Sequence, residues 1–82
     1  MEINKYASKS CMKCKVLDRI LKSVNLPCSV NTLYVEDNEE LFKEKGIEQL
    51  PTLEISNEGK ESIYLTGTIA PKQIAEAIDK LR

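Results

Sequence analysis

The sequence contains no histidine, and it has only three cysteines, three prolines and three glycines among its 82 residues. The lack of histidine excludes a cysteine–histidine hydrolase. It also leaves any zinc site with only cysteines and carboxylates as ligands. No apolar run approaches the roughly 20 residues of a membrane-spanning helix, and residues 1–7 lack the apolar core of a signal peptide. We therefore expect no membrane partner and a cytoplasmic location.

An excess of one charge is also missing. Twelve Lys and Arg residues are interspersed among 13 Asp and Glu residues, which gives a formal net charge of −1. Such a chain has no basic field to attract phosphate backbones, so nucleic acid is not an expected partner. Hydrophobic residues make up 41% and charged residues 30% of the chain, which is typical of a globular protein. With no repeats or linkers, residues 1–82 should form a single domain.

The spacing of hydrophobic residues predicts seven elements in the order β-α-β-α-β-β-α. A βαβ unit gives two parallel strands, and the later hairpin can add two antiparallel strands to one edge. The fold class is therefore α/β, with a four-stranded mixed sheet flanked by helices. The predicted elements are a strand at 2–7, an amphipathic helix from Cys11 to about Val24, a strand at 30–35, a short helix from Asn38 to Gly46, strands at 52–56 and 62–66, and a helix with Pro71 in its first turn that runs to Leu81.

Three local details follow from the same patterns. Asn38 can cap the short helix, which would carry Leu41 and Phe42 inward, and Gly46 would end it. In the strand at 52–56, Leu53 and Ile55 alternate with the polar Glu54. This alternation is typical of a strand with one buried face.

The reactive chemistry is expected at the junction of the first strand and the first helix, where the chain reads Ser10-Cys11-Met12-Lys13-Cys14. Free amide groups at a helix N-terminus carry positive partial charge and favour a thiolate. Helix N-termini and nearby cations lower a cysteine pKa from about 8.5 toward about 7, and Lys9 and Lys13 could add to this effect. Because the first cysteine is the more exposed, Cys11 should attack and Cys14 should resolve.

The cysteine pair has other interpretations. An odd number of cysteines in a chain without an export signal argues against a disulfide-stapled scaffold. A zinc site would need Cys28 and carboxylates as further ligands. A copper-type carrier domain also places two such cysteines after its first strand, but it has the order β-α-β-β-α-β, whereas this chain is predicted to end on a helix.

A second motif, Gln49-Leu50-Pro51-Thr52-Leu53, lies far from the cysteines in the sequence. Proline cannot donate to a sheet ladder, so its place at the head of an apolar strand implies a special backbone, such as a cis bond. Together with residues 10–15, Gly46-Ile47, residues 57–60 and Gly67, this motif resembles the thioredoxin family in order and spacing. The resemblance covers nearly the whole chain.

The resemblance implies a thioredoxin-like fold and a set of site residues. Pro51 would be cis and lie beside the two sulfurs, and the Leu50 backbone would pair with a substrate strand. Gly67 would border the same groove, kept small for close approach, and the alternative is an ordinary turn glycine. Met12 and Lys13, between the cysteines, are further expected substrate contacts.

The sequence also departs from the family pattern. The typical Trp-Cys-Gly-Pro-Cys is replaced by residues 10–14, and an extra strand and helix before the catalytic strand are absent. Lys5 stands where the family carries a buried carboxylate, six residues before Cys11. It could tune the site, as could Lys9, or it could be a strand lysine whose stem reaches solvent. The compact length is closer to glutaredoxins, but residues 66–71 lack their Gly-Gly motif.

The sequence therefore predicts a thiol–disulfide oxidoreductase that reduces protein disulfides, with no bound cofactor and no metal. Its partners would be disulfide-containing proteins and an external reductase of the thioredoxin-reductase type, with glutathione less favoured. The alternatives are a glutaredoxin-like reductase that uses glutathione, or a module in which the cysteine pair holds a metal or an iron–sulfur cluster. Cys28 is expected to be a small, partly buried residue or to have a regulatory role, and the place of Tyr6 is left open.

Overall fold

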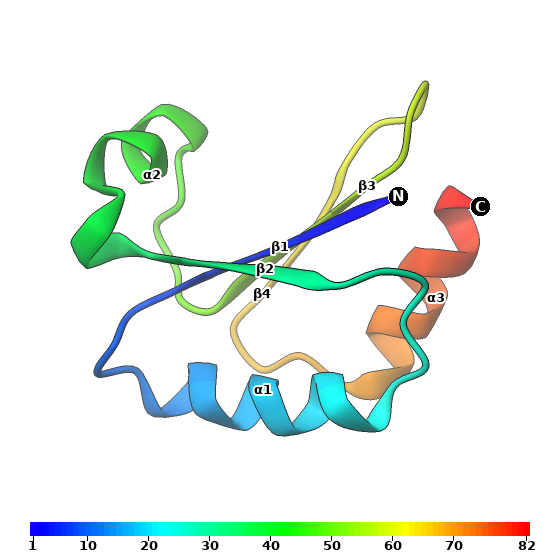
Figure 1. Ribbon diagram of the computed structural model, residues 1–82, viewed down its shortest axis with the longest axis horizontal. Coiled ribbons are helices and arrows are strands. Elements are labelled where there is room, and N and C mark those ends of the chain that lie inside the picture. The colour runs from blue at the N-terminus through cyan, green and yellow to red at the C-terminus, as the bar shows by residue number, and fades with distance from the viewer.

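A computed structural model describes residues 1–82, and it contains four strands, three α-helices and one short 3-10 helix (Figure 1). The order of strands and α-helices is the predicted one. Val35 does not extend the second strand as expected, because the chain turns there into the 3-10 helix. The elements are β1 (Glu2–Ala7), α1 (Met12–Ser23), β2 (Val30–Tyr34), η1 (Val35–Asp37), α2 (Glu39–Lys45), β3 (Thr52–Ser56), β4 (Ile63–Thr66) and α3 (Pro71–Leu81).

The sheet has the strand order β2-β1-β3-β4. β1 pairs with β2 in parallel and with β3 in antiparallel orientation, and β3 pairs with β4 in antiparallel orientation. The predicted mixed sheet is therefore confirmed. Tyr6 near the end of β1 lies opposite Thr52 at the start of β3, and Thr52 lies opposite Thr66 at the end of β4. Hence the turn after β1, the segment before β3 and the turn after β4 meet at one edge of the sheet.

Helices cover both faces of the sheet, with α1 and α3 on one side and α2 on the other (Figure 1). The main core lies between the sheet and the α1–α3 layer, because Ile3, Leu53 and Ile55 point there from the central strands. Leu17 and Leu21 of α1 belong to the same core, together with apolar residues of α3. On the opposite face, Tyr6 meets Phe42 of α2 edge to face, with ring centroids 5.2 Å apart.

Glu54 differs from its sequence-based expectation. The alternation does put it on the face opposite Leu53 and Ile55, but α2 covers that face and the residue is only 5% exposed. Its carboxylate accepts hydrogen bonds from Tyr6 Oη at 2.6 Å and Tyr64 Oη at 2.8 Å. Asn4 Nδ2 and Lys45 Nζ, each at 3.2 Å, complete the set of donors. A buried charge is tolerated here because four donors surround it.

The ends of α2 follow the prediction only in part. Asn38 stands at the N-cap, but its side chain accepts no hydrogen bond from the helix and instead donates to the Tyr34 carbonyl at 3.0 Å. Phe42 is buried as expected, whereas Leu41 is only half-buried. Gly46 ends the helix with φ of 68°, in the left-handed region that glycine adopts without steric cost.

No helix in the structure is both long enough and apolar enough to cross a membrane.

Candidate active site

The two cysteines lie at the start of α1, at the sheet edge where the three turns meet. Cys11 is the N-cap residue, and its sulfur accepts a hydrogen bond from the Cys14 backbone amide at 3.2 Å. This amide is one of those that a helix leaves without an internal partner, so the sulfur takes the place of a capping oxygen. Both residues are free thiols. A donor aimed at a sulfur favours negative charge on it.

The two sulfurs differ in their surroundings. Cys11 is partly exposed, whereas Cys14 is 3% exposed and faces the core side of α1. Burial raises the pKa of Cys14 to about 11, and its hydrogen bond with Cys11 adds to this effect. The Ser8 backbone and the charge of Lys5 act in the opposite direction. Of the two thiols, only Cys11 is accessible from the surface.

Glu36 of η1 forms hydrogen bonds with the turn that precedes the cysteines, residues 8–10. Its carboxylate accepts hydrogen bonds from Ser8 Oγ at 2.8 Å and from the Lys9 backbone amide at 3.2 Å. The hydrogen bond from Ser8 is the main reason why the pKa of Glu36 is lowered. The Lys9 ammonium pairs with Asp37 at 3.3 Å and lies over the Tyr34 ring. The contacts of Glu36 and Asp37 with the cysteine turn were not predicted from the sequence.

Lys5 is buried, and the interpretation of it as a lysine that reaches solvent is wrong. Only 3% of its side chain is exposed, and its ammonium forms an ion pair with the Asp18 carboxylate of α1. Lys5 points to the α1 face because β1 alternates, and Asp18 meets it there. A cavity of about 230 Å³ adjoins this pair, and Lys5, Cys14 and Asp18 all contribute to its wall. Asp18 was not singled out from the sequence.

The remaining predicted site residues lie around the same sheet edge. The Leu50–Pro51 peptide bond is cis, the geometry that the family resemblance implies. Pro51 is buried and Leu50 is half-buried. The Gly67 amide donates to the Pro51 carbonyl at 3.2 Å, so the turn after β4 lies beside the segment before β3.

A groove of about 210 Å³ runs beside the first turns of α1. Lys13 and Val16 line one side and Gly67 lines the other, with the apolar Leu17, Ile20 and Ile69 also in its wall. Met12 and Val16 are large apolar residues that are 71% and 51% exposed. The structure thus brings Lys13 and Gly67 into one groove and leaves Met12 free on the surface next to Cys11.

Cys28 does not join the other two cysteines. It precedes β2, is partly buried and packs against the main core, as a small apolar residue would. No group of three or more His, Cys, Asp or Glu side chains is placed to hold a metal ion. Tyr6, whose place was left open, is buried on the α2 face.

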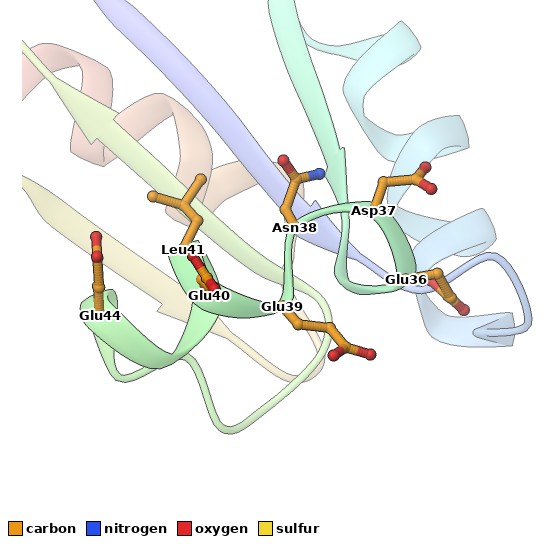
Figure 2. A pocket seen from close by; sticks show the side chains of 7 residues that line it. All are labelled: Glu36, Asp37, Asn38, Glu39, Glu40, Leu41 and Glu44. Atoms are coloured by element: carbon orange, nitrogen blue, oxygen red, sulfur yellow. The ribbon is translucent and has the colours of Figure 1, made fainter.

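The largest hollow on the molecule lies elsewhere, over η1 and the first turns of α2. It measures about 620 Å³, and its wall carries Glu36, Asp37, Glu39, Glu40 and Glu44. Figure 2 shows these carboxylates spread along the two helices, with no nucleophile among the labelled side chains. Glu36 and Asp37 contact Ser8 and Lys9 of the cysteine turn, and the rest of this acidic surface is separate from the site.

Comparisons with known proteins agree with this arrangement. The family model described as Thioredoxin matches residues 3–80. Among solved structures, a chloroplastic thioredoxin z is similar at 26% identity and a TM-score of 0.80, over 95% of this chain and 74% of that one. Desulfothioredoxin from Desulfovibrio vulgaris Hildenborough is 23% identical with a TM-score of 0.78, over 98% and 80%. A mutant thioredoxin from Halobacterium salinarum NRC-1 is 18% identical with a TM-score of 0.82, over 95% and 71%. No curated protein sequence matches this chain.

Proposed function

The chain belongs to the thioredoxin family, and we propose that it is a thiol–disulfide oxidoreductase that reduces disulfide bonds in proteins through Cys11 and Cys14. The observation that carries this proposal is the asymmetry of the two sulfurs. Cys11 is partly exposed and accepts an amide hydrogen bond, whereas Cys14 is buried directly behind it in the same helix turn. An accessible nucleophile and a protected second thiol are what a two-step exchange requires.

The reaction proceeds in two displacements. The Cys11 thiolate attacks one sulfur of the substrate disulfide, the substrate S–S bond breaks, and the other substrate sulfur leaves as a thiolate. Cys14 then attacks the Cys11 sulfur of the mixed disulfide, which releases the reduced substrate and leaves a Cys11–Cys14 disulfide. An external reductase of the thioredoxin-reductase type returns the pair to the dithiol. We propose the cytoplasm as the compartment, because thiols are kept reduced there.

The substrate would dock over the sheet edge that carries the site. Met12 and Lys13 would contact the segment next to the substrate disulfide, while the Leu50 backbone, Pro51 and Gly67 would form the opposite side. The exposed Met12 side chain and the groove between Lys13 and Gly67 support this placement. Lys9 and Lys5 would adjust the charge around the sulfurs, since both line the cavity beside Cys14.

The test separates the two cysteines by function. Cys11→Ser should abolish reduction of a protein disulfide such as those of insulin, because the attacking thiol is gone. Cys14→Ser should still attack but stall as a mixed disulfide, which mass spectrometry of the non-reduced protein would detect. Cys28→Ser is the matched control and should keep full activity. Full activity in Cys11→Ser would refute the mechanism.

A glutathione-dependent activity is distinguished by the redox potential of the pair. A thioredoxin-like reductant should equilibrate near about −270 mV, and a glutaredoxin-like protein near about −200 to −230 mV. We expect the lower value, because Thr66-Gly67-Thr68 stands where glutaredoxins carry their Gly-Gly motif. Reduction by glutathione alone at a rate equal to that with a thioredoxin reductase would contradict this part of the proposal.

A further inference from the structure

The proposed reaction leaves one chemical problem unsolved, which is how Cys14 loses its proton. Cys14 can attack the mixed disulfide only as a thiolate, yet it is 3% exposed and burial raises its pKa to about 11. A thiol in this state is almost entirely protonated at neutral pH. The second displacement therefore needs a group near Cys14 that accepts a proton or stabilises the thiolate.

The cavity of about 230 Å³ beside Cys14 contains both kinds of group. Asp18 is the one carboxylate in its wall, and it follows Cys14 by four residues in α1, so the two side chains share one face of the helix. The Lys5 ammonium enters from β1 and pairs with Asp18. The titratable or charged groups that face the cavity are Lys5 from β1, Lys9 from the turn after it, Cys14, Lys15 and Asp18 from α1, and Tyr34 from β2.

We propose that Asp18 accepts the proton of Cys14 and that Lys5 stabilises the resulting thiolate, so that this ion pair drives the second displacement. The inference rests on the proposed function and assigns a role to a residue outside the cysteine motif. The buried carboxylate that the family carries on the strand is replaced here by Lys5, and the carboxylate comes from the helix instead.

The exposure of the pair fits these two roles. Lys5 is 3% exposed, so its charge acts on Cys14 with little screening by solvent, whereas the Asp18 side chain is 49% exposed. Asp18 can therefore pass a proton on to water after accepting it. A cavity of this size also admits water, which occupies about 30 Å³ per molecule in the liquid.

The proposed step balances in atoms and electrons. The S–H proton of Cys14 moves to the Asp18 carboxylate, directly or through a water molecule in the cavity. The Cys14 sulfur then bonds to the Cys11 sulfur, the bond between Cys11 and the substrate sulfur breaks, and its electron pair leaves with the substrate as a thiolate. Asp18 finally releases the proton to solvent. No oxidant or reductant is needed beyond the substrate disulfide.

The two displacements can be timed separately with one reagent. In stopped flow, an equimolar amount of the aromatic disulfide 5,5′-dithiobis(2-nitrobenzoic acid) releases one coloured thiolate when Cys11 attacks and a second when Cys14 resolves. The measurement is made in a Cys28→Ser background so that only these two thiols react. Asp18→Asn removes the proton acceptor and keeps the shape, and Asp79→Asn makes the same change on the exposed side of α3 as a control.

We expect Asp18→Asn to keep the first phase and to slow the second by about tenfold or more at neutral pH, the low end of what general base catalysis contributes. Its second phase should then accelerate with rising pH and converge with the wild type where the thiol ionises without help. Asp18→Glu, which keeps the carboxylate, should restore most of the rate. Lys5→Met should slow the second phase and move the convergence to higher pH, because the thiolate has lost its cation.

The outcomes separate this inference from the proposed function. A second phase that Asp18→Asn leaves unchanged across the pH range, as Asp79→Asn should, would overturn the role of Asp18. Equal slowing of both phases would also overturn it, since this points to a general structural effect. The absence of any first phase in the Cys28→Ser protein would instead refute Cys11 as the nucleophile. Circular dichroism of each variant verifies folding, and Asp18→Glu supplies the test if Asp18→Asn fails to fold.

Discussion

The buried Glu54 carboxylate should make the stability of this protein depend on pH. Burial alone would raise its pKa, but hydrogen bonds from Tyr6, Tyr64, Asn4 and Lys45 outweigh this effect and hold the pKa at about 2, against an ordinary value of 4.5. At about 1.4 kcal/mol per pKa unit, this difference corresponds to ~3 kcal/mol of folding free energy. For a domain of this size it is a large share of a total that is about 5–15 kcal/mol in most proteins.

The sign of the effect follows from linkage. Because the pKa is lower in the folded state, the unfolded chain binds the proton more tightly. The stabilisation is thus fully present above the ordinary pKa of 4.5 and is lost as the pH falls from there toward about 2. Glu54→Gln cannot titrate, so the difference in unfolding free energy between wild type and variant should shrink by ~3 kcal/mol over this window.

Urea denaturation followed by circular dichroism, at steps from neutral pH down to about pH 2, measures this difference. Glu58→Gln is a suitable control, because Glu58 lies exposed in the turn between β3 and β4. At neutral pH, Glu54→Gln should lose ~3 kcal/mol, the upper end of what a hydrogen bond to a charged group contributes. If the stability curves of wild type and Glu54→Gln run parallel through the acid range, the argument that the four donors bind a charged Glu54 is refuted.

Two further predictions concern the site itself. Iodoacetamide should label Cys11 first and Cys14 last at pH 8. Labelling of Cys14 should increase only as the pH rises toward its pKa of about 11, because the buried thiol stays protonated below it. Peptide mass spectrometry measures the labelling, and labelling of Cys14 as fast as that of Cys28 would contradict the prediction. Gly67→Val should lose about 1–2 kcal/mol in thermal unfolding and Gly67→Asn less, because Gly67 has φ of 71° and the left-handed region penalises a β-branched residue. No atom lies within 4 Å of a Cβ placed at Gly67, so crowding does not contribute to this loss. A Gly67→Val protein as stable as the wild type would contradict the prediction and show that the backbone relaxes.

The parts of the fold that could be predicted from the sequence depend on residues close together in the chain. The spacing of Leu17 and Leu21 predicts the buried side of α1, and Gly46 marks a helix end, because each pattern acts within a turn or two. Val16 shares the apolar pattern but is 51% exposed. The place of the cysteine motif was also predictable, since two cysteines separated by two residues directly before an amphipathic pattern fall at the start of the helix.

The parts that could not be predicted depend on partners far apart in the chain. Lys5 meets Asp18 across 13 positions, and Glu54 meets Tyr6 across 48. A lysine or glutamate in a strand is usually solvated, and only the covering helix decides otherwise. One signal was available for Asp18, because it follows Cys14 by four residues and so shares its helix face. Asn38 does stand at the N-cap of α2, but its side chain does not cap the helix, because its Nδ2 donates to the Tyr34 carbonyl instead.

The position of β1 in the middle of the sheet has a consequence for the order in which the site is completed. The cysteines follow the first strand, whereas the segment at Leu50-Pro51 and the turn at Gly67 belong to the second half of the chain. During synthesis the dithiol therefore leaves the ribosome before the strands that will carry the other side of the groove. Under the proposed mechanism, a nascent chain has its nucleophilic sulfur before the residues proposed to contact the substrate, so selectivity would arise only when β3 and β4 have joined β1.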